Sequence, residues 1–151
     1  MSTELEGGCL CGAIRYAIAD VYDAAYCHCS ICRRTSGAPA VVWANLRLRD
    51  FRLTKGEPTR FQSSEHWLRF FCGTCGSPIF QRTASPPEDG SDLVCVLAPT
   101  LDDPEAVRPT AHIWCASKLS YFDDQSALPE FPAGELSDPG DRAPCRIERS
   151  T

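Results

Sequence analysis

The sequence predicts an all-β fold built in layers, with short helical turns. Several short runs show strand-type patterning, and glycine or proline turns separate them. No segment carries the repeating apolar pattern of a long helix, so helices that connect parallel strands are not expected. At 151 residues, the chain has the length of one domain with a substantial core.

The expected elements follow in order along the chain. In residues 12–19, Ile14, Tyr16 and Ile18 alternate with smaller or charged residues, as in a half-buried strand. Cys9 and Cys11 stand at the start of this strand, where side chains two residues apart would face the same way. A turn or a single helical turn is expected at residues 29–37. The remaining strands are expected at residues 40–46, 49–53, 59–62, 66–71, 77–82 and 93–98.

The last part of the chain differs in composition. From Asp123 onward, prolines, glycines and acidic residues are frequent, and too few apolar side chains remain for a separate core. The sequence therefore predicts a β domain over residues 1–122 and an irregular C-terminal arm over residues 123–151. No apolar run approaches the roughly 20 residues that span a bilayer, so a membrane is not expected as a partner.

Ten cysteines stand out in a chain whose net charge is −5. The acidic balance argues against a nucleic-acid partner, because that affinity comes mostly from Lys and Arg. The N-terminal residues lack the basic and apolar stretches of a secretory signal, so a cytoplasmic location is expected. Thiols stay reduced there, and closely spaced cysteines then favour metal sites over disulfides.

The clustered cysteines form two pairs and a triplet, namely Cys9 and Cys11, Cys72 and Cys75, and Cys27, Cys29 and Cys32. The simplest partition joins the two pairs into a closed, structural zinc site with four thiolates. The spacing does not force this partition, since Cys27 and Cys29 with Cys72 and Cys75 would also make a four-sulfur site. A redox role for Cys72 and Cys75 is less favoured, because that motif expects a βαβ setting.

The triplet would leave one position of a zinc ion open. A thiol bound at such a position loses its proton near neutral pH, so the triplet favours thiol chemistry over hydrolysis. The alternative is that the chain supplies a fourth ligand. The candidates for that ligand are His28, His66, His112, Cys95 and Cys115. Of these, His28 is expected to point away from a metal held by its two neighbours, and Cys95 is expected to be a small buried hydrophobe.

Four segments resemble a known family: GCLCGAIRY at 8–16, CHCSICRR at 27–34, SGAP at 36–39 and FCGTCG at 71–76. The chain resembles the Gfa family, named for its glutathione-dependent formaldehyde-activating enzymes, over about residues 5–122. Formaldehyde-specific members tend to carry Trp-Lys-Pro after the third cysteine of the triplet. Here Arg33, Arg34 and Thr35 stand in that place, so the resemblance is to the broad branch whose substrates are unassigned.

The resemblance implies a β-tent of antiparallel sheets around two zinc ions per chain. It implies Cys9, Cys11, Cys72 and Cys75 as ligands of the structural ion, and Cys27, Cys29 and Cys32 as ligands and catalytic residues of the open site. The implied activity is that of a carbon–sulfur lyase acting on an adduct of glutathione and an aldehyde, of the S-hydroxymethylglutathione type. The alternative is a zinc-stabilised, non-catalytic binding or thiol-carrier module, because the addition also proceeds unaided.

Several further residues carry expectations of their own. Arg33 and Arg34 are candidates to bind the carboxylates of glutathione, because arginine presents a planar fork of donors; the alternative is a solvated surface pair. Cys145 is expected to be a free, exposed thiol in the arm. The aromatic residues expected to build the core around the structural ion are Trp43, Trp67, Phe70 and Phe71.

Overall fold

The computed structural model describes residues 4–85 and 92–127. The internal contacts divide the chain into two units, residues 1–119 and residues 120–151. Within the second unit, the described residues form a 3₁₀-helix, η5 (Ser120–Ala127). The expected arm lies outside the described residues from residue 128 onward, as does Cys145. The domain boundary at residue 122 and the exposure of Cys145 therefore stay predictions.

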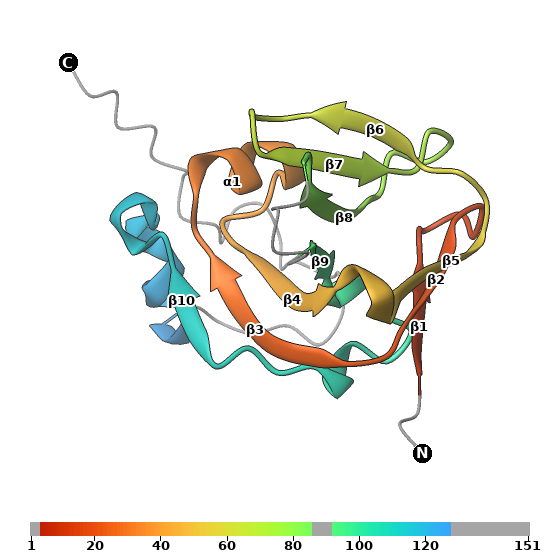
Figure 1. Ribbon diagram of the computed structural model, residues 1–151. Coiled ribbons are helices and arrows are strands. Elements are labelled where there is room, and N and C mark those ends of the chain that lie inside the picture. The colour runs from red at the N-terminus through yellow and green to blue at the C-terminus, as the bar shows by residue number, and fades with distance from the viewer. Residues whose placement is uncertain (1–3, 86–91, 128–151) are drawn as a thin grey trace, which may run out of the picture. The chain divides into compact units, whose positions relative to one another are not determined.

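The described part of the first unit contains ten strands in two sheets (Figure 1). A three-stranded sheet has the order β1–β2–β5, and a seven-stranded sheet has the order β10–β3–β4–β9–β8–β7–β6. The bounds are β1 (Leu5–Gly8), β2 (Arg15–Ile18), β3 (Val21–Cys27), β4 (Val41–Arg47), β5 (Phe51–Lys55), β6 (Thr59–Gln62), β7 (Trp67–Phe71), β8 (Pro78–Thr83), β9 (Leu93–Leu97) and β10 (Ala111–Ile113). The prediction of an all-β fold is confirmed.

The helical elements are short, as the sequence indicates. The segment after β3 forms α1 (Ser30–Ser36), which ends at Gly37 in the left-handed conformation, φ 72°. The other helices of the first unit are 3₁₀ turns: η1 (Leu48–Asp50), η2 (Ala98–Thr100), η3 (Pro104–Ala106) and η4 (Cys115–Ser117). Among the described residues, no helix has the length and apolar character needed to cross a membrane.

Two local expectations are wrong. Cys9 and Cys11 do not lie on a strand, because β1 ends before them and β2 begins after them, at Arg15. They lie in the turn between these strands. The expectation of antiparallel sheets is wrong for one strand pair, because β10 pairs with β3 in parallel. The other strand pairs of the described residues are antiparallel. The sequence did not predict β1, β3 or β10, since their glycines, alanines and short length give weak strand signals.

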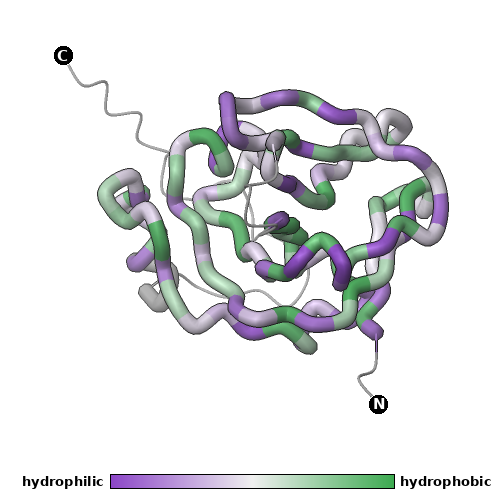
Figure 2. Tube along the Cα trace, in the orientation of Figure 1, coloured by the Kyte–Doolittle hydropathy of each residue, from purple (hydrophilic) through white to green (hydrophobic). Residues whose placement is uncertain are grey.

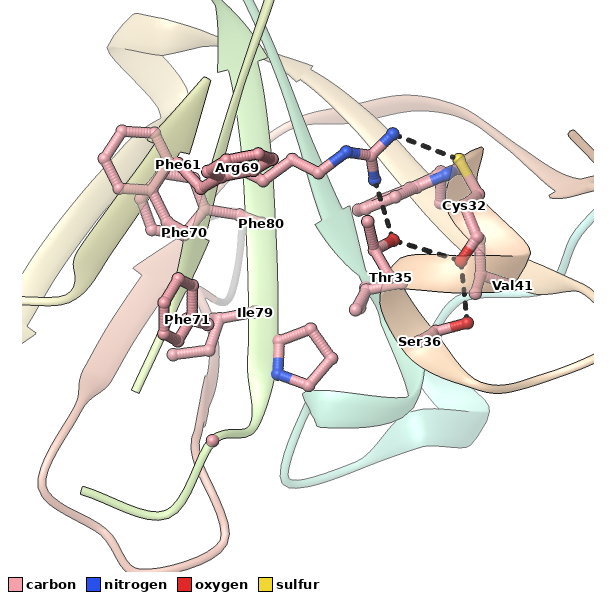
Figure 3. Close-up of a pocket in the computed structure, with 14 residues that line it drawn as sticks. Cys32, Thr35, Ser36, Val41, Phe61, Arg69, Phe70, Phe71, Ile79 and Phe80 are labelled. Carbon is pink, nitrogen blue, oxygen red and sulfur yellow. Dashed lines mark hydrogen bonds between the residues drawn. The ribbon is translucent and has the colours of Figure 1, made fainter. Parts of the chain in front are cut away.

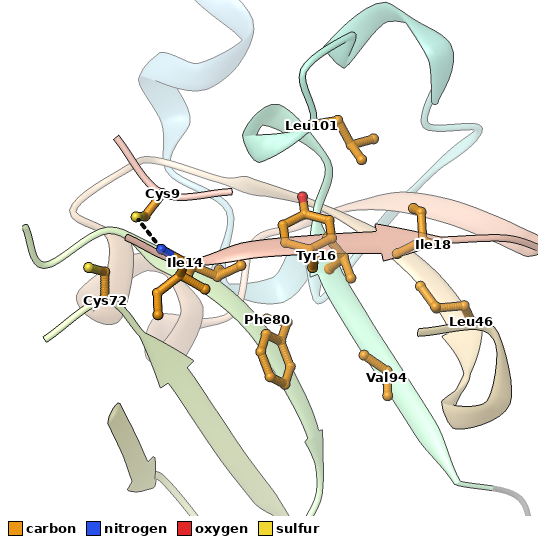
Figure 4. Close-up of a cluster of buried hydrophobic side chains, with 11 residues drawn as sticks. Cys9, Ile14, Tyr16, Ile18, Leu46, Cys72, Phe80, Val94 and Leu101 are labelled. Atoms are coloured by element: carbon orange, nitrogen blue, oxygen red, sulfur yellow. Dashed lines mark hydrogen bonds between the residues drawn. The ribbon is translucent and has the colours of Figure 1, made fainter. Parts of the chain in front are cut away.

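The seven-stranded sheet has one buried side-chain cluster on each face, and β9 contributes to both. Successive side chains of a strand point to opposite faces. Val94 and Val96 therefore lie in the first cluster, with Cys9, Ile14, Tyr16, Ile18, Leu46, Cys72, Ile79, Phe80 and Leu101 (Figure 4). Cys95 and Leu97 lie in the second cluster, with Cys27, Cys32, Val41 and Trp43. The hydrophilic residues along β6 (Figure 2) fit its position at the sheet edge, where all four residues are exposed.

The tryptophans do not surround the expected structural ion. Trp43 belongs to the second cluster and Trp67 packs against it, on the side of Cys27 and Cys32. Phe70 does pack against the first cluster, which includes Cys9 and Cys72. The expectation for the two tryptophans is wrong because the sequence shows that a residue is buried but not which side of a sheet with two buried faces it occupies.

Candidate metal centres and the adjoining cavity

Two tight turns bring together a four-cysteine cluster, which consists of Cys9, Cys11, Cys72 and Cys75. The first two cysteines lie in the turn between β1 and β2, and the other two lie in the turn between β7 and β8. The four sulfur atoms all lie within 4.8 Å of one another. The Sγ atoms of Cys9 and Cys11 are 3.6 Å apart, and those of Cys11 and Cys72 are 3.8 Å apart.

Each of these turns closes on a glycine in the left-handed conformation. Gly12 has φ 76° and Gly76 has φ 78°, values that L-residues with a side chain rarely adopt. The N–H of Gly12 donates to the carbonyl of Cys9 (3.2 Å), and the N–H of Gly76 donates to the carbonyl of Cys72 (2.8 Å). The glycines thus allow the chain to fold back sharply enough to present two sulfurs from each turn.

Hydrogen-bond donors surround the sulfurs of the four-cysteine cluster. The N–H of Ile14 lies 3.2 Å from Cys9 Sγ (Figure 4), and the N–H of Cys75 lies 3.5 Å from Cys72 Sγ. The hydroxyl of Ser77 lies 3.1 Å from Cys75 Sγ. Hydrogen bonds from Ser77 lower the pKa of Cys75 to about 5. The surroundings of Cys75 therefore favour its thiolate, the form of cysteine that binds metals.

The three-cysteine cluster comes from one continuous segment at the junction of β3 and α1. Cys27 ends β3, Cys29 is the N-cap of α1, and Cys32 lies in its first turn. The N–H of Cys32 donates to Cys29 Sγ (3.2 Å), and the Sγ atoms of Cys27 and Cys32 are 3.6 Å apart. All three sulfurs lie within 4.8 Å of one another. The other four-sulfur partition considered from the sequence, Cys27 and Cys29 with the Cys72 turn, is not the grouping observed.

The thiols of the three-cysteine cluster differ in acidity. The pKa of Cys32 is lowered to about 5, first because Cys27 donates a hydrogen bond to its sulfur, and also because Cys29, Arg69 and Trp43 favour the charged form. The same hydrogen bond raises the pKa of Cys27, and burial raises it further. Cys32 is therefore the first thiol of this cluster to ionise.

No fourth His, Cys, Asp or Glu among the described residues joins the three-cysteine cluster. His28 is fully buried, and its Nε2 lies 2.9 Å from Nδ1 of His112 on β10. Cys95 is buried in the same core cluster, as expected of a small hydrophobe, and Cys115 is exposed. His66 is exposed as well. The chain thus groups three sulfurs here and four sulfurs at the other cluster.

A cavity of about 320 Å³ adjoins Cys32. Its lining comes from α1, β4 and the β6–β9 strands: Cys32, Thr35, Ser36, Val41, Trp43, Phe61, Arg69, Phe70, Phe71, Gly76, Pro78, Ile79, Phe80 and Leu97. Figure 3 shows the Arg69 side chain extending toward Cys32 and Thr35, with Phe61, Phe70 and Phe80 away from the sulfur. The cavity is thus apolar at one end and has a cation beside a thiol at the other.

Arg69 is the charged residue among those that line the cavity, and hydrogen bonds fix its position. Its Nε donates to Ser63 Oγ (2.9 Å), its Nη1 donates to Thr35 Oγ1 (3.3 Å), and its Nη2 lies 3.5 Å from Cys32 Sγ. Arg69 was not expected at this site from the sequence, because it lies 37 positions from Cys32. The available signal was a lone charge within the aromatic strand sequence WLRFF.

Arg33 and Arg34, the residues expected to bind glutathione, lie on α1 but do not line the cavity. The Nη1 of Arg33 donates to the carbonyl of Ser117 (3.0 Å), and Arg34 is exposed. Their role in binding a thiol stays a prediction.

Comparisons with known proteins agree with this picture. A family model described as glutathione-dependent formaldehyde-activating enzyme matches residues 4–117. The structure is similar to the crystal structure of a Rhodobacter sphaeroides protein, with 26% identity and a TM-score of 0.55; the match covers 72% of this chain and 99% of that one. The search of curated proteins found no match.

The family match and the two cysteine clusters able to hold a metal ion give the protein a metal-binding role related to thiols. Because the family model covers most of the chain, the protein belongs to the glutathione-dependent formaldehyde-activating enzyme (Gfa) family.

Proposed function

We propose that this protein is a zinc-dependent carbon–sulfur lyase that forms and cleaves the adduct of a small thiol, such as glutathione, and an aldehyde. The observation that carries the proposal is the three-cysteine cluster, which groups fewer sulfurs than the other cluster and adjoins a cavity. In the proposed reaction, the thiol sulfur bonds to the carbonyl carbon and the thiol proton ends on the oxygen. Cleavage is the reverse.

The spacing of the sulfurs supports zinc as the metal, with two ions per chain. A tetrahedral site with Zn–S bonds of about 2.3 Å has sulfur–sulfur edges of about 3.8 Å. The corresponding distances here are 3.6 and 3.8 Å in the four-cysteine cluster and 3.6 Å in the three-cysteine cluster. We therefore assign Cys9, Cys11, Cys72 and Cys75 to a structural zinc, and Cys27, Cys29 and Cys32 to a zinc with an open position.

The residues around the three-cysteine cluster have roles that suit this addition. Zinc bound there supplies a position at which a thiol loses its proton near neutral pH. The guanidinium of Arg69, beside Cys32, would stabilise the negative charge that develops on the aldehyde oxygen. The apolar walls of the cavity exclude water from the reacting atoms.

A non-catalytic thiol carrier is the second candidate function. The same three-cysteine cluster and cavity would serve it, because binding a thiol needs a metal position and space but no acceleration of the addition. Such a carrier would bind the thiol without changing the rate at which the adduct forms.

The proposed partner is a small thiol, and the proposed location is the cytoplasm. The nine described cysteines are free thiols, as expected in a compartment that keeps thiols reduced. The net charge of −5 supports the expectation that nucleic acid is not a partner.

Exchange NMR on glutathione and formaldehyde tests the lyase against the carrier. We expect the zinc-loaded protein to speed interconversion of the free thiol and the adduct, and the Cys29→Ser variant to lose this effect. Cys115→Ser is the matched control, because Cys115 is exposed and lies outside both clusters. A rate with the zinc-loaded wild-type protein no faster than the rate without protein would leave only the carrier.

A further inference from the structure

We infer that the aldehyde used at this site carries a bulky apolar group, aromatic or of similar size, and that the cavity beside Cys32 binds this group. The inference rests on the proposed function and names the substrate class of the same site. The reaction is the addition already described, in which the S–H adds across the C=O bond, so no oxidant or reductant takes part.

The size of the cavity is the first argument. Its volume of about 320 Å³ is many times the roughly 10–15 Å³ that one water needs. Packed protein interiors contain few voids larger than a water molecule. Formaldehyde bears only hydrogens on its carbonyl carbon, so it would leave nearly all of this space unfilled. A larger group attached to that carbon would fill it.

The chemistry of the lining is the second argument. Four phenylalanines, Phe61, Phe70, Phe71 and Phe80, are among the residues that line the cavity. Such side chains bind another aromatic or aliphatic group through contact and exclusion of water. The body of glutathione, with two carboxylates and an ammonium group, does not match these walls.

The polar end of the cavity gives the third argument, because it orients the aldehyde. Trp43 is only 6% exposed, and its indole N–H has no partner of ordinary hydrogen-bond geometry among the described residues. It lines the cavity together with Arg69 and Cys32. A carbonyl oxygen at this end would accept hydrogen bonds from Trp43 and Arg69. The group on the carbonyl carbon would then extend toward the phenylalanines (Figure 3).

The test compares two aldehydes with one thiol. Adduct interconversion is measured by exchange NMR with zinc-loaded protein and glutathione, using formaldehyde and 3-phenylpropanal, and the rate without protein is subtracted. We expect kcat/KM to be about tenfold or more higher for 3-phenylpropanal, the discrimination that an apolar pocket provides. A protein that accelerates the formaldehyde reaction equally or better would overturn the inference.

A variant pair locates the preference. Phe61 is 60% exposed on the edge strand β6, so Phe61→Ala should fold while removing part of the cavity wall. We expect the ratio of the two kcat/KM values to fall by about threefold to tenfold. Tyr22→Ala is the control, because Tyr22 is 51% exposed on β3 and lies outside the cavity. If the ratio falls equally in both variants, or in neither, the cavity is not where the apolar group of the aldehyde binds.

Binding of 3-phenylpropan-1-ol separates the inference from the proposed function, because this alcohol forms no adduct. We expect saturable binding by calorimetry that is weaker in Phe61→Ala than in Tyr22→Ala. If the alcohol binds in this way but no aldehyde reaction is accelerated, the lyase fails and the apolar ligand class stands. If formaldehyde is processed and neither the alcohol nor 3-phenylpropanal is recognised, the lyase stands and the inference fails.

Discussion

The two cysteine clusters differ in how far apart their members lie along the chain. Cys11 and Cys72 are 61 positions apart, whereas Cys27 and Cys32 are five apart. Treated as crosslinks, these loops remove about 4 and about 2 kcal/mol of unfolded-chain entropy, respectively. The four-cysteine cluster joins a turn of the three-stranded sheet to a turn of the seven-stranded sheet. The three-cysteine cluster joins only residues that are close in the sequence, so it should contribute less to the stability of the fold.

The two clusters also differ in the groups that surround their sulfur atoms. Backbone N–H groups and Ser77 lie against the sulfurs of the four-cysteine cluster. The three-cysteine cluster has a guanidinium and a cavity beside it. Position in the chain and local environment thus agree in suggesting a structural role for one cluster and a functional role for the other.

The largest expected effect comes from loss of the four-cysteine cluster. In a Cys72→Ser/Cys75→Ser variant we expect no cooperative thermal unfolding transition by circular dichroism. Structural zinc contributes on the order of 10–16 kcal/mol in small zinc peptides, as much as the whole stability of a typical domain, about 5–15 kcal/mol. Cys115→Ser should unfold like the wild-type protein. A double variant that still unfolds cooperatively would contradict the structural assignment.

Removing one sulfur from the three-cysteine cluster should affect function far more than folding. The N–H of Cys32 donates to Cys29 Sγ at the start of α1, and a serine hydroxyl is a good N-cap acceptor. We therefore expect Cys29→Ser to stay folded, with stability lowered by about 1 kcal/mol or less. Metal analysis should find about one zinc instead of two. Unfolding of this variant would show that the three-cysteine cluster is structural too.

Lowering the pH should release zinc, an effect smaller than the loss of a cysteine cluster but larger than a change in the core. The pKa values of Cys32 and Cys75 are both lowered to about 5. Their thiolates hold metal above that pH, and the stabilisation is lost as the pH falls through it. Because Arg69 is one of the groups that lower the pKa of Cys32, Arg69→Ala should release the zinc of the three-cysteine cluster at higher pH.

A zinc-sensitive dye followed during a pH titration measures this release. Arg69→Ala should release the zinc of the three-cysteine cluster at a higher pH than the wild-type protein does, with the release from the four-cysteine cluster unchanged. Arg60→Ala is the matched control, because Arg60 is an exposed arginine on β6 that does not line the cavity. The same release pH for the zinc of the three-cysteine cluster in all three proteins would show that Arg69 does not act on Cys32.

The smallest expected effect is in the core next to the four-cysteine cluster. The buried hydroxyl of Tyr16 lies 2.7 Å from Thr100 Oγ1, which also donates to the carbonyl of Leu97 (2.8 Å). Tyr16→Phe should lower the free energy of unfolding by about 0.5–1.5 kcal/mol in denaturant titrations. The adduct rate should not change, because Tyr16 belongs to the first core cluster and not to the second. A slower rate would mean that the two regions are coupled.

Local patterns in the sequence were enough to predict many of the strands and turns of the fold. Alternation in the segment around Tyr16 and the apolar run at residues 93–98 correspond to β2 and β9. Closely spaced cysteines with following glycines marked both cysteine turns, and the helical turn after Cys29 is α1. Strand β3, with its alanines and aspartate, could not be predicted because pairing with β4 and β10 stabilises it, not its own composition.

The sequence by itself determined which residues can bind a metal, since ligand type and close spacing are local properties. It also pointed to the family through the same segments. Only the tertiary structure decided which cysteines meet across 61 positions, and that Arg69 and Trp43 lie with Cys32 at one cavity. These contacts depend on strand order and on which face of each strand a side chain occupies. Neither property is encoded in any short stretch of the chain.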